Sequence, residues 1–223
     1  MKNLICLISV FLFAGSAFLA GQTIPEKKSS TFKNEPAIEN IMLARQLMVY
    51  GYDHNDPLSL LMSARLFLEW PPQSLITEGT SIKSGVEVQK VNVPFDVTAM
   101  LNDAVKFSGG DESIQKMADE IAAGSSKGAK KGPMYGEYVL SGQEYITFEV
   151  KFTGNEVAIV GAAGDGNADI DLYIYTKDGI LVVADDSESY ECLVMWFPEK
   201  TANFLIKVVN RGMNSTRFGI AAN

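Results

Sequence analysis

The spacing of the apolar residues changes near the middle of the chain, and this change constrains the fold more than any other feature of the sequence. From Pro36 onward apolar residues recur three and four positions apart, which is the period of a helix. After Pro133 they alternate with polar residues, most clearly in 146–152, which is the period of a strand with one face in a core. The sequence therefore predicts an α+β chain in two parts, with helices first and strands second.

Capping residues divide the helical part into two hairpins. We expect four helices, at about 37–50, 57–69, 97–107 and 112–123. Aspartates that suit helix starts and glycines or prolines that suit helix ends bound them, namely Asp56, Asp96, Asp111, Gly51, Pro71, Pro72, Gly109, Gly110 and Gly124. The two hairpins would pack together as a four-helix unit over 37–124. Between them, 73–94 is expected to form a long, poorly ordered loop or a small hairpin.

The pattern of the second part predicts a series of short strands. Residues 125–133, with three lysines among small and polar residues, are typical of a linker. Eight strands are then expected, at about 135–140, 146–152, 156–162, 170–176, 180–184, 192–197, 204–210 and 217–221. Short strands at this spacing predict an antiparallel β-sandwich of jelly-roll type over 134–223.

The first 21 residues have the pattern of a secretory signal peptide. Lys2 precedes the uncharged run Leu4–Ala20, and small residues crowd the end of that run. We expect cleavage between Ala17 and Gln22, followed by a flexible lead-in over 22–36; an uncleaved membrane anchor is the alternative. The predicted location is secreted or periplasmic, without stable membrane insertion after cleavage.

Charge and cysteine content limit the partners and the chemistry. The net charge of −8 disfavours duplex nucleic acid as a ligand. Loss of the leader would leave Cys192 as the one cysteine, so an internal disulfide is excluded. Because Cys192 begins an apolar run of strand type, we expect it to be a small buried hydrophobe.

Part of the chain resembles a known family. The pattern lies in 169–175 (Asp-Ile-Asp-Leu-Tyr-Ile-Tyr), in 178–185, in the run Trp196-Phe197-Pro198 and in 204–210. In these residues 135–223 is similar to the bacterial pre-peptidase C-terminal domain family. The resemblance implies a non-catalytic β-sandwich that aids secretion, folding or attachment to a matrix, with calcium bound in some members. Phe204 stands where a tyrosine is usual, and no peptidase precedes the domain, so the resemblance does not imply proteolysis.

An acidic segment suggests a cation site. Asp165, Asn167 and Asp169 alternate along the chain, and Asp185 follows later, so their oxygens could converge on a calcium ion. The spacing starts like an EF-hand loop but lacks that loop's glycine and bidentate glutamate. Two interpretations stay open: a calcium site at the rim of the sandwich, or an acidic turn followed by solvent-facing aspartates.

Alternation along 169–175 also predicts a ligand-binding platform. Asp169, Asp171, Tyr173 and Tyr175 fall on one face of the strand. Aromatic rings beside carboxylates suit a sugar or a peptide, because the rings offer apolar faces and the acids accept hydrogen bonds. The alternative is that the tyrosines pack across strands and keep their hydroxyls in water.

Motifs of catalysis are missing from the sequence. The one histidine, His54, lies in a turn between helices, and a dyad with Cys192 would have to join a core strand to that turn. We therefore infer an exported, non-catalytic binding or accessory module that contacts a protein or polysaccharide, with calcium as an optional ion and no required cofactor. The alternatives are a carboxylate-based hydrolase with its site between the two parts, and a structural envelope component whose helices oligomerise.

Overall fold

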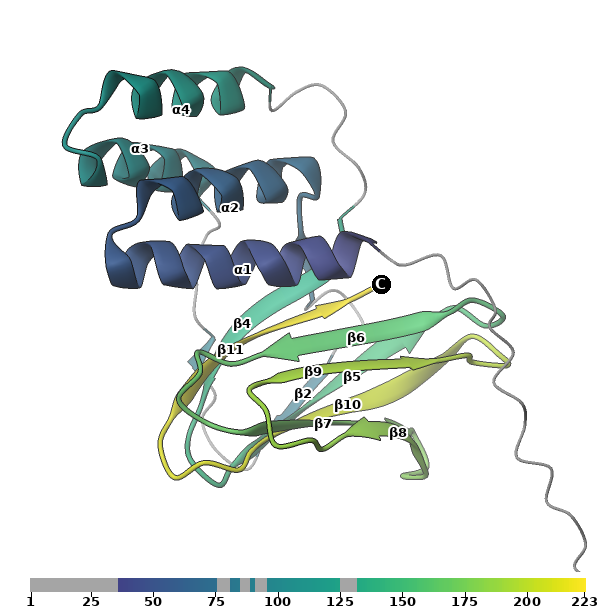
Figure 1. The fold of residues 1–223 in the computed structure, drawn as a ribbon. Helices are drawn as coiled ribbons and strands as arrows, with labels where there is room; N and C mark the ends of the chain where they lie inside the picture. The colour runs from purple at the N-terminus through teal and green to yellow at the C-terminus, as the bar shows by residue number, and fades with distance from the viewer. Residues whose placement is uncertain (1–35, 76–80, 85–88, 91–95, 125–131) are drawn as a thin grey trace, which may run out of the picture. The chain divides into compact units, whose positions relative to one another are not determined.

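A computed structural model of the 223-residue chain describes residues 36–75, 81–84, 89–90, 96–124 and 132–223. Helices α1 (Pro36–His54), α2 (Pro57–Glu69), α3 (Val97–Phe107) and α4 (Glu112–Gly124) precede most of the strands (Figure 1). The predicted signal peptide, nearly all of the lead-in and most of the predicted linker lie outside the described residues. Among the described helices, none combines the length and the apolarity needed to cross a bilayer.

Aspartate side chains start three of the helices, as the sequence predicts. Asp56 accepts a hydrogen bond from the backbone N–H of Ser59 at 3.0 Å, and Asp96 accepts one from Ala99 at 3.0 Å. Asp111 accepts from Ser113 at 2.7 Å. Each bond satisfies a first-turn N–H group that has no partner within the helix.

The predicted end of the first helix is wrong. Gly51 does not stop α1, which continues to His54. A Cβ atom at Gly51 would lie 2.7 Å from Cδ2 of Leu60 in α2. The glycine therefore allows two helices to approach closely within the hairpin, a role that its local sequence does not distinguish from helix termination.

The strands form two sheets. Strands β4 (Met134–Leu140), β6 (Ala158–Ala163), β9 (Glu191–Trp196) and β11 (Thr216–Ala222) make most of the first sheet, in the order β4-β11-β6-β9. Strands β5 (Tyr145–Phe152), β7 (Ile170–Thr176), β8 (Leu181–Asp185) and β10 (Ala202–Asn210) make most of the second, in the order β5-β10-β7-β8. Together they form the predicted antiparallel sandwich, and each of the eight expected strands is present within two residues of its expected bounds.

In its described residues, the segment 73–94 differs from the prediction of a loop or a small hairpin. Its described residues form β1 (Gln73–Ser74), β2 (Ser81–Ser84) and β3 (Gln89–Lys90). Strands β1 and β3 pair with β4, and β2 pairs with β5, so they extend the two sheets of the sandwich. Edge strands leave backbone N–H and C=O groups unpaired, and these short segments satisfy part of them.

Two apolar cores hold the chain together. The first lies between the sheets and contains the inward residues of the strands, such as Phe148, Leu172 and Phe218. The second joins the helices to the outer face of the first sheet, where Ile159 and Ala221 pack with helix residues such as Ile41. The apolar faces of the helices are therefore covered partly by one another and partly by the sandwich, and α1 is the helix that packs against β6 and β11 (Figure 1).

Candidate ligand-binding site

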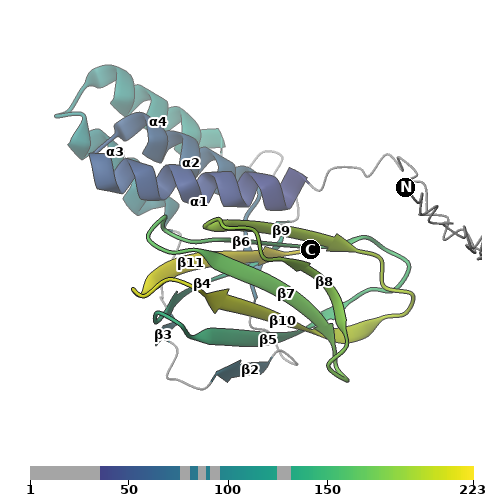
Figure 2. The same cartoon turned by 60° about the horizontal axis from the view of Figure 1, so that its bottom comes forward.

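Strand β7 presents its residues as the alternation predicts. Ile170, Leu172 and Ile174 are fully buried in the core of the sandwich. Asp171, Tyr173 and Tyr175 lie on the opposite, outer face of the second sheet, whereas Asp169 precedes the strand. Figure 2 shows this sheet on the side of the sandwich away from the helices.

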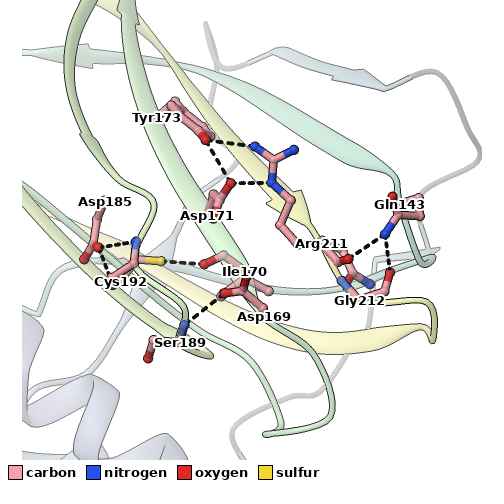
Figure 3. A network of polar contacts seen from close by, with 12 residues as sticks. Gln143, Asp169, Ile170, Asp171, Tyr173, Asp185, Ser189, Cys192, Arg211 and Gly212 are labelled. Atoms are coloured by element: carbon pink, nitrogen blue, oxygen red, sulfur yellow. Dashed lines mark hydrogen bonds and ion pairs between the residues drawn. The ribbon is translucent and has the colours of Figure 1, made fainter.

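One predicted ligand residue is not solvent-facing. Asp171 retains only 4% side-chain exposure because Arg211, from the end of β10, covers it. The Nε group of Arg211 donates a hydrogen bond to Oδ2 of Asp171 at 2.5 Å, and Tyr173 donates its hydroxyl to the same oxygen at 2.8 Å (Figure 3). Nη2 of Arg211 donates in turn to the Tyr173 hydroxyl at 2.9 Å. Asp171 therefore positions Tyr173 and Arg211.

The electrostatics of this group favour the same arrangement. Burial, and then the hydrogen bond to Asp171, raise the pKa of Tyr173, so its hydroxyl keeps its proton. The hydrogen bonds to Asp171 and Tyr173 raise the pKa of Arg211, whose side chain is 52% exposed. Arg211 lies in the turn after β10, where no local pattern marks it as a site residue; the pairing of β10 with β7, which places Arg211 beside Asp169, is the signal that identifies it.

Aromatic and basic residues continue across the sheet. The rings of Tyr173 and Tyr175 are stacked with centroids 6.3 Å apart and an interplanar angle of 26°. On β10, Lys207 lies opposite Tyr173, and its Nζ is 4.2 Å from the centroid of the Tyr145 ring on β5. We call the outward residues of β5, β7 and β10 the tyrosine face: Tyr145, Thr147, Glu149, Lys151, Asp171, Tyr173, Tyr175, Asn203, Leu205, Lys207 and Val209.

The suspected calcium ligands are engaged in other contacts. Asp165 accepts hydrogen bonds from Thr216 Oγ1 at 2.9 Å and from the Arg217 N–H at 3.1 Å. Asp169 accepts from the Ser189 N–H, and Asp185 accepts from the Ser187 hydroxyl and the Leu193 N–H. The backbone N–H of Asn167 donates to Asp165. In the described parts of the chain, no group of three or more His, Cys, Asp or Glu side chains is placed to hold a metal ion.

The stability of the fold at acidic pH depends on the carboxylate of Asp165. Partial burial acts to raise the pKa of Asp165, but the hydrogen bonds from Arg217, Thr216 and Asn167 outweigh it and lower the pKa. The carboxylate therefore stabilises the fold above its unfolded pKa of about 3.9, and this contribution is lost as pH falls through the lower folded value.

We expect Asp165→Asn to destabilise the chain more at pH 7 than at pH 3, measured by urea unfolding at both pH values. Asp178→Asn, in an exposed turn, is the control and should have little effect at either pH. A loss for Asp165→Asn that is the same at both pH values would contradict this assignment.

Cys192 is a buried residue of the sandwich core, as predicted. Its Sγ donates to the carbonyl oxygen of Ile170 at 3.0 Å. Burial, followed by the charge of Asp185, raises the pKa of the thiol to about 12, so at neutral pH the nucleophilic thiolate is absent. His54 lies in the exposed last turn of α1 and stacks on Tyr50.

The junction between helices and sandwich holds a buried ionic network. Arg45 of α1 donates to the carbonyl oxygens of Gly164 at 2.9 Å and Arg217 at 3.0 Å, and its Nε lies 3.4 Å from Oε1 of Glu137. Glu137, on β4, also accepts from Arg217 Nε at 2.6 Å and from the Tyr135 hydroxyl at 2.8 Å. The glutamate is thus enclosed by two guanidinium groups and a phenol.

This network does not provide the paired acids of a glycosidase. Among the described residues, the buried carboxylates are Glu137 in the first sheet and Asp171 in the second, and both are ion-paired. A glycosidase needs one carboxyl group with a raised pKa close to a second carboxylate. In the part of the chain that the structure describes, hydrogen bonds to the carboxylate lower the pKa values of four carboxyl groups, those of Asp56, Asp111, Asp165 and Asp185.

Comparison with known proteins gives a likeness to other β-sandwich structures. No family model and no curated protein matches the chain. A periplasmic inhibitor of g-type lysozyme from Aeromonas hydrophila is 9% identical, with 41% of this chain and 86% of that chain covered and a TM-score of 0.31. TmCBM61, solved with β-1,4-galactotriose, is 12% identical over 65% of this chain and 87% of that chain, with a TM-score of 0.30.

A third similar structure is the CBM36-1 domain of a xylanase from the hindgut metagenome of Trinervitermes trinervoides. It is 12% identical over 65% of this chain and 96% of that chain, with a TM-score of 0.30. Identities and scores this low do not identify a ligand for this chain.

Proposed function

We propose that the chain is a non-catalytic binding module and that its tyrosine face holds a polysaccharide outside the cytoplasm. The observation that carries the proposal is the stacked pair Tyr173 and Tyr175 beside the Asp171–Arg211 ion pair. Tyrosine rings offer apolar surface to the C–H faces of a sugar ring, while their hydroxyls and the guanidinium group hydrogen-bond to its oxygens. Asp171 holds Tyr173 and Arg211 in place before a ligand arrives, which lowers the entropic cost of binding.

A polysaccharide fits this surface better than an extended peptide does. Strands β10 and β7 are paired on both sides, and β5 pairs with β10 along its length and with β2 over 146–149, so most of their backbone groups are used within the sheet. An extended peptide gains most of its affinity by pairing with a free strand edge. A ligand on the tyrosine face can meet only side chains, and a sugar chain has no backbone amides that would need such pairing.

Export is part of the proposal and rests on the sequence. The pattern of the first 21 residues supports secretion or a periplasmic location. The resemblance of 135–223 to pre-peptidase C-terminal domains supports an accessory role for the sandwich. Calcium stays a prediction; a higher melting temperature in millimolar calcium than in chelator would support it.

We expect Tyr175→Ala to weaken polysaccharide binding at least tenfold, which corresponds to about 1.4 kcal/mol. Tyr175 offers its ring to a ligand without the hydrogen bonds that fix Tyr173, so its loss should leave the fold intact. The measurement is affinity electrophoresis of the chain through gels that contain galactan, xylan, β-glucan, dextran, dextran sulfate, alginate or polygalacturonate.

Tyr50→Ala is the matched control for this experiment. Tyr50 is an exposed tyrosine on α1, in contact with His54 and remote from the second sheet. This variant should migrate as the unchanged chain does in every gel. The proposal fails if no polysaccharide retards the chain, or if Tyr50→Ala weakens retardation as much as Tyr175→Ala does.

A further inference from the structure

The charge of the tyrosine face differs from that of the chain as a whole. The chain carries a net charge of −8, yet a lysine occupies the middle of this face. Lys207 lies on β10, the central strand of the three, between Thr147 on β5 and Tyr173 on β7. Its ammonium group is the charge nearest to the centre of the proposed binding surface.

No carboxylate neutralises Lys207 within the described parts of the chain. Glu149 forms an ion pair with Lys177 at 3.3 Å and accepts a hydrogen bond from Asn203 at 2.9 Å. Asp171 is taken by Arg211 and Tyr173, as described above. Lys207 instead lies over the ring of Tyr145, a contact that attracts a cation without neutralising its charge.

Arg211 adds a second cationic group at the end of the same face. Its Nε and Nη2 atoms bond to Asp171 and Tyr173, while Nη1 has no partner among the described residues. The side chain is about half exposed, so its free edge faces solvent. With Lys151 at the other end, basic groups extend along the tyrosine face, and both of its carboxylates are already paired.

We infer that the polysaccharide of the proposed function is anionic, with carboxylate or sulfate groups on its sugar rings. This inference rests on the proposed function and names the class of its ligand. A neutral chain seated on the tyrosine face would remove Lys207 from water without giving it an anionic partner, which costs free energy. An acidic sugar ring packed on Tyr173 would bring its anion to the ammonium of Lys207 and form a charge-assisted hydrogen bond.

The test compares anionic oligosaccharides with neutral counterparts of the same backbone. Isothermal titration of the chain uses oligogalacturonate and oligoalginate, each against its methyl ester, and dextran sulfate against dextran. We expect at least one anionic member to bind tenfold or more tightly than its neutral counterpart. Lys207→Met should lower the ratio of anionic to neutral affinity at least fivefold, and it should leave the affinity for the neutral counterpart the same or raise it.

Lys116→Met is the matched control, because it makes the same charge change at an exposed position of α4, off the tyrosine face. It should alter the affinity for the anionic oligosaccharide less than twofold. Equal losses from Lys207→Met and Lys116→Met would show diffuse attraction by charge and overturn the inference.

The remaining outcomes separate this inference from the proposed function. If neutral and anionic members bind equally and Lys207→Met has no effect, while Tyr175→Ala still weakens binding, the inference is overturned and the polysaccharide function stands. If no member binds while galactan, xylan or β-glucan still retards the chain in the gels, the inference is overturned and the polysaccharide function stands. If no polysaccharide binds in either experiment, both are overturned.

Discussion

Glu137→Gln is expected to lower the free energy of unfolding by about 3 to 5 kcal/mol, because it leaves Arg45 buried without its counter-charge. Arg45 is 1% exposed, and Glu137 is the carboxylate paired with its guanidinium group. The remaining partners of the Arg45 guanidinium group are backbone carbonyl oxygens, which carry only partial charge. Urea unfolding followed by far-UV circular dichroism measures the loss.

Two further variants separate charge from side-chain shape. Glu156→Gln, at an exposed position, should change stability by less than about 0.5 kcal/mol. Combining Arg45→Met with Glu137→Leu removes both buried charges and should recover part of the loss, since an apolar pair of similar size avoids the desolvation penalty. The recovery stays partial because the Tyr135 hydroxyl and the Gly164 and Arg217 carbonyl oxygens lose their partners in the network. If Glu137→Gln is as stable as the unchanged chain, the network does not hold the helices on the sandwich.

Gly219 explains how Arg45 reaches this position. A Cβ atom at Gly219, on β11, would lie 2.5 Å from Cδ of Arg45. Because glycine has no side chain, the guanidinium group of Arg45 can approach the first sheet and reach the carbonyl oxygens of Gly164 and Arg217. Helix α1 is thus attached to the sheet by polar contacts as well as by the apolar core around Ile159.

Asn210→Ala is expected to destabilise the chain by about 3 kcal/mol. The side chain is fully buried; its Nδ2 donates to the carbonyl oxygens of Leu140, Ser141 and Asn214, and its Oδ1 accepts from the Gly212 N–H at 2.9 Å. Truncation leaves several of these groups without partners, and each buried unsatisfied group costs about 1 to 3 kcal/mol. Thermal and urea unfolding both measure the effect.

The control for Asn210 lies in the loop that follows β10. Asn214 is exposed and takes part in this network only through its backbone carbonyl, so Asn214→Ala should be close to neutral. Asn210→Asp keeps the shape of the side chain but cannot donate, and should lose nearly as much stability as Asn210→Ala. A stable Asn210→Asp variant would mean that the three carbonyl oxygens find other donors.

Local patterns in the sequence predict the elements well. Alternation in 170–176 assigns Tyr173 and Tyr175 to one face of β7 because the period of a strand is fixed by backbone geometry. The aspartates that start α2, α3 and α4 act within one helical turn, so they too are visible in the sequence. Gly109 and Gly110, with φ of +70° and +85°, follow the end of α3 as expected.

Contacts between distant segments are what the sequence does not reveal. Asp171 is buried by Arg211, from the turn that follows β10, and so it differs from the free acceptor that alternation alone suggests. Glu137 and Arg45 lie in a strand and a helix with no shared local pattern. The pairing of β2 with β5 likewise depends on which edge is left open once the sheets form.

The most direct test of the tyrosine face as a binding surface is a map of backbone amide chemical-shift changes. The ligand is the oligosaccharide that binds most tightly in the titrations above. We predict that the largest changes fall on β5, β7 and β10 around Tyr173, Tyr175 and Lys207. Changes confined to the helices or to the first sheet, or none at saturating oligosaccharide, would contradict the proposal.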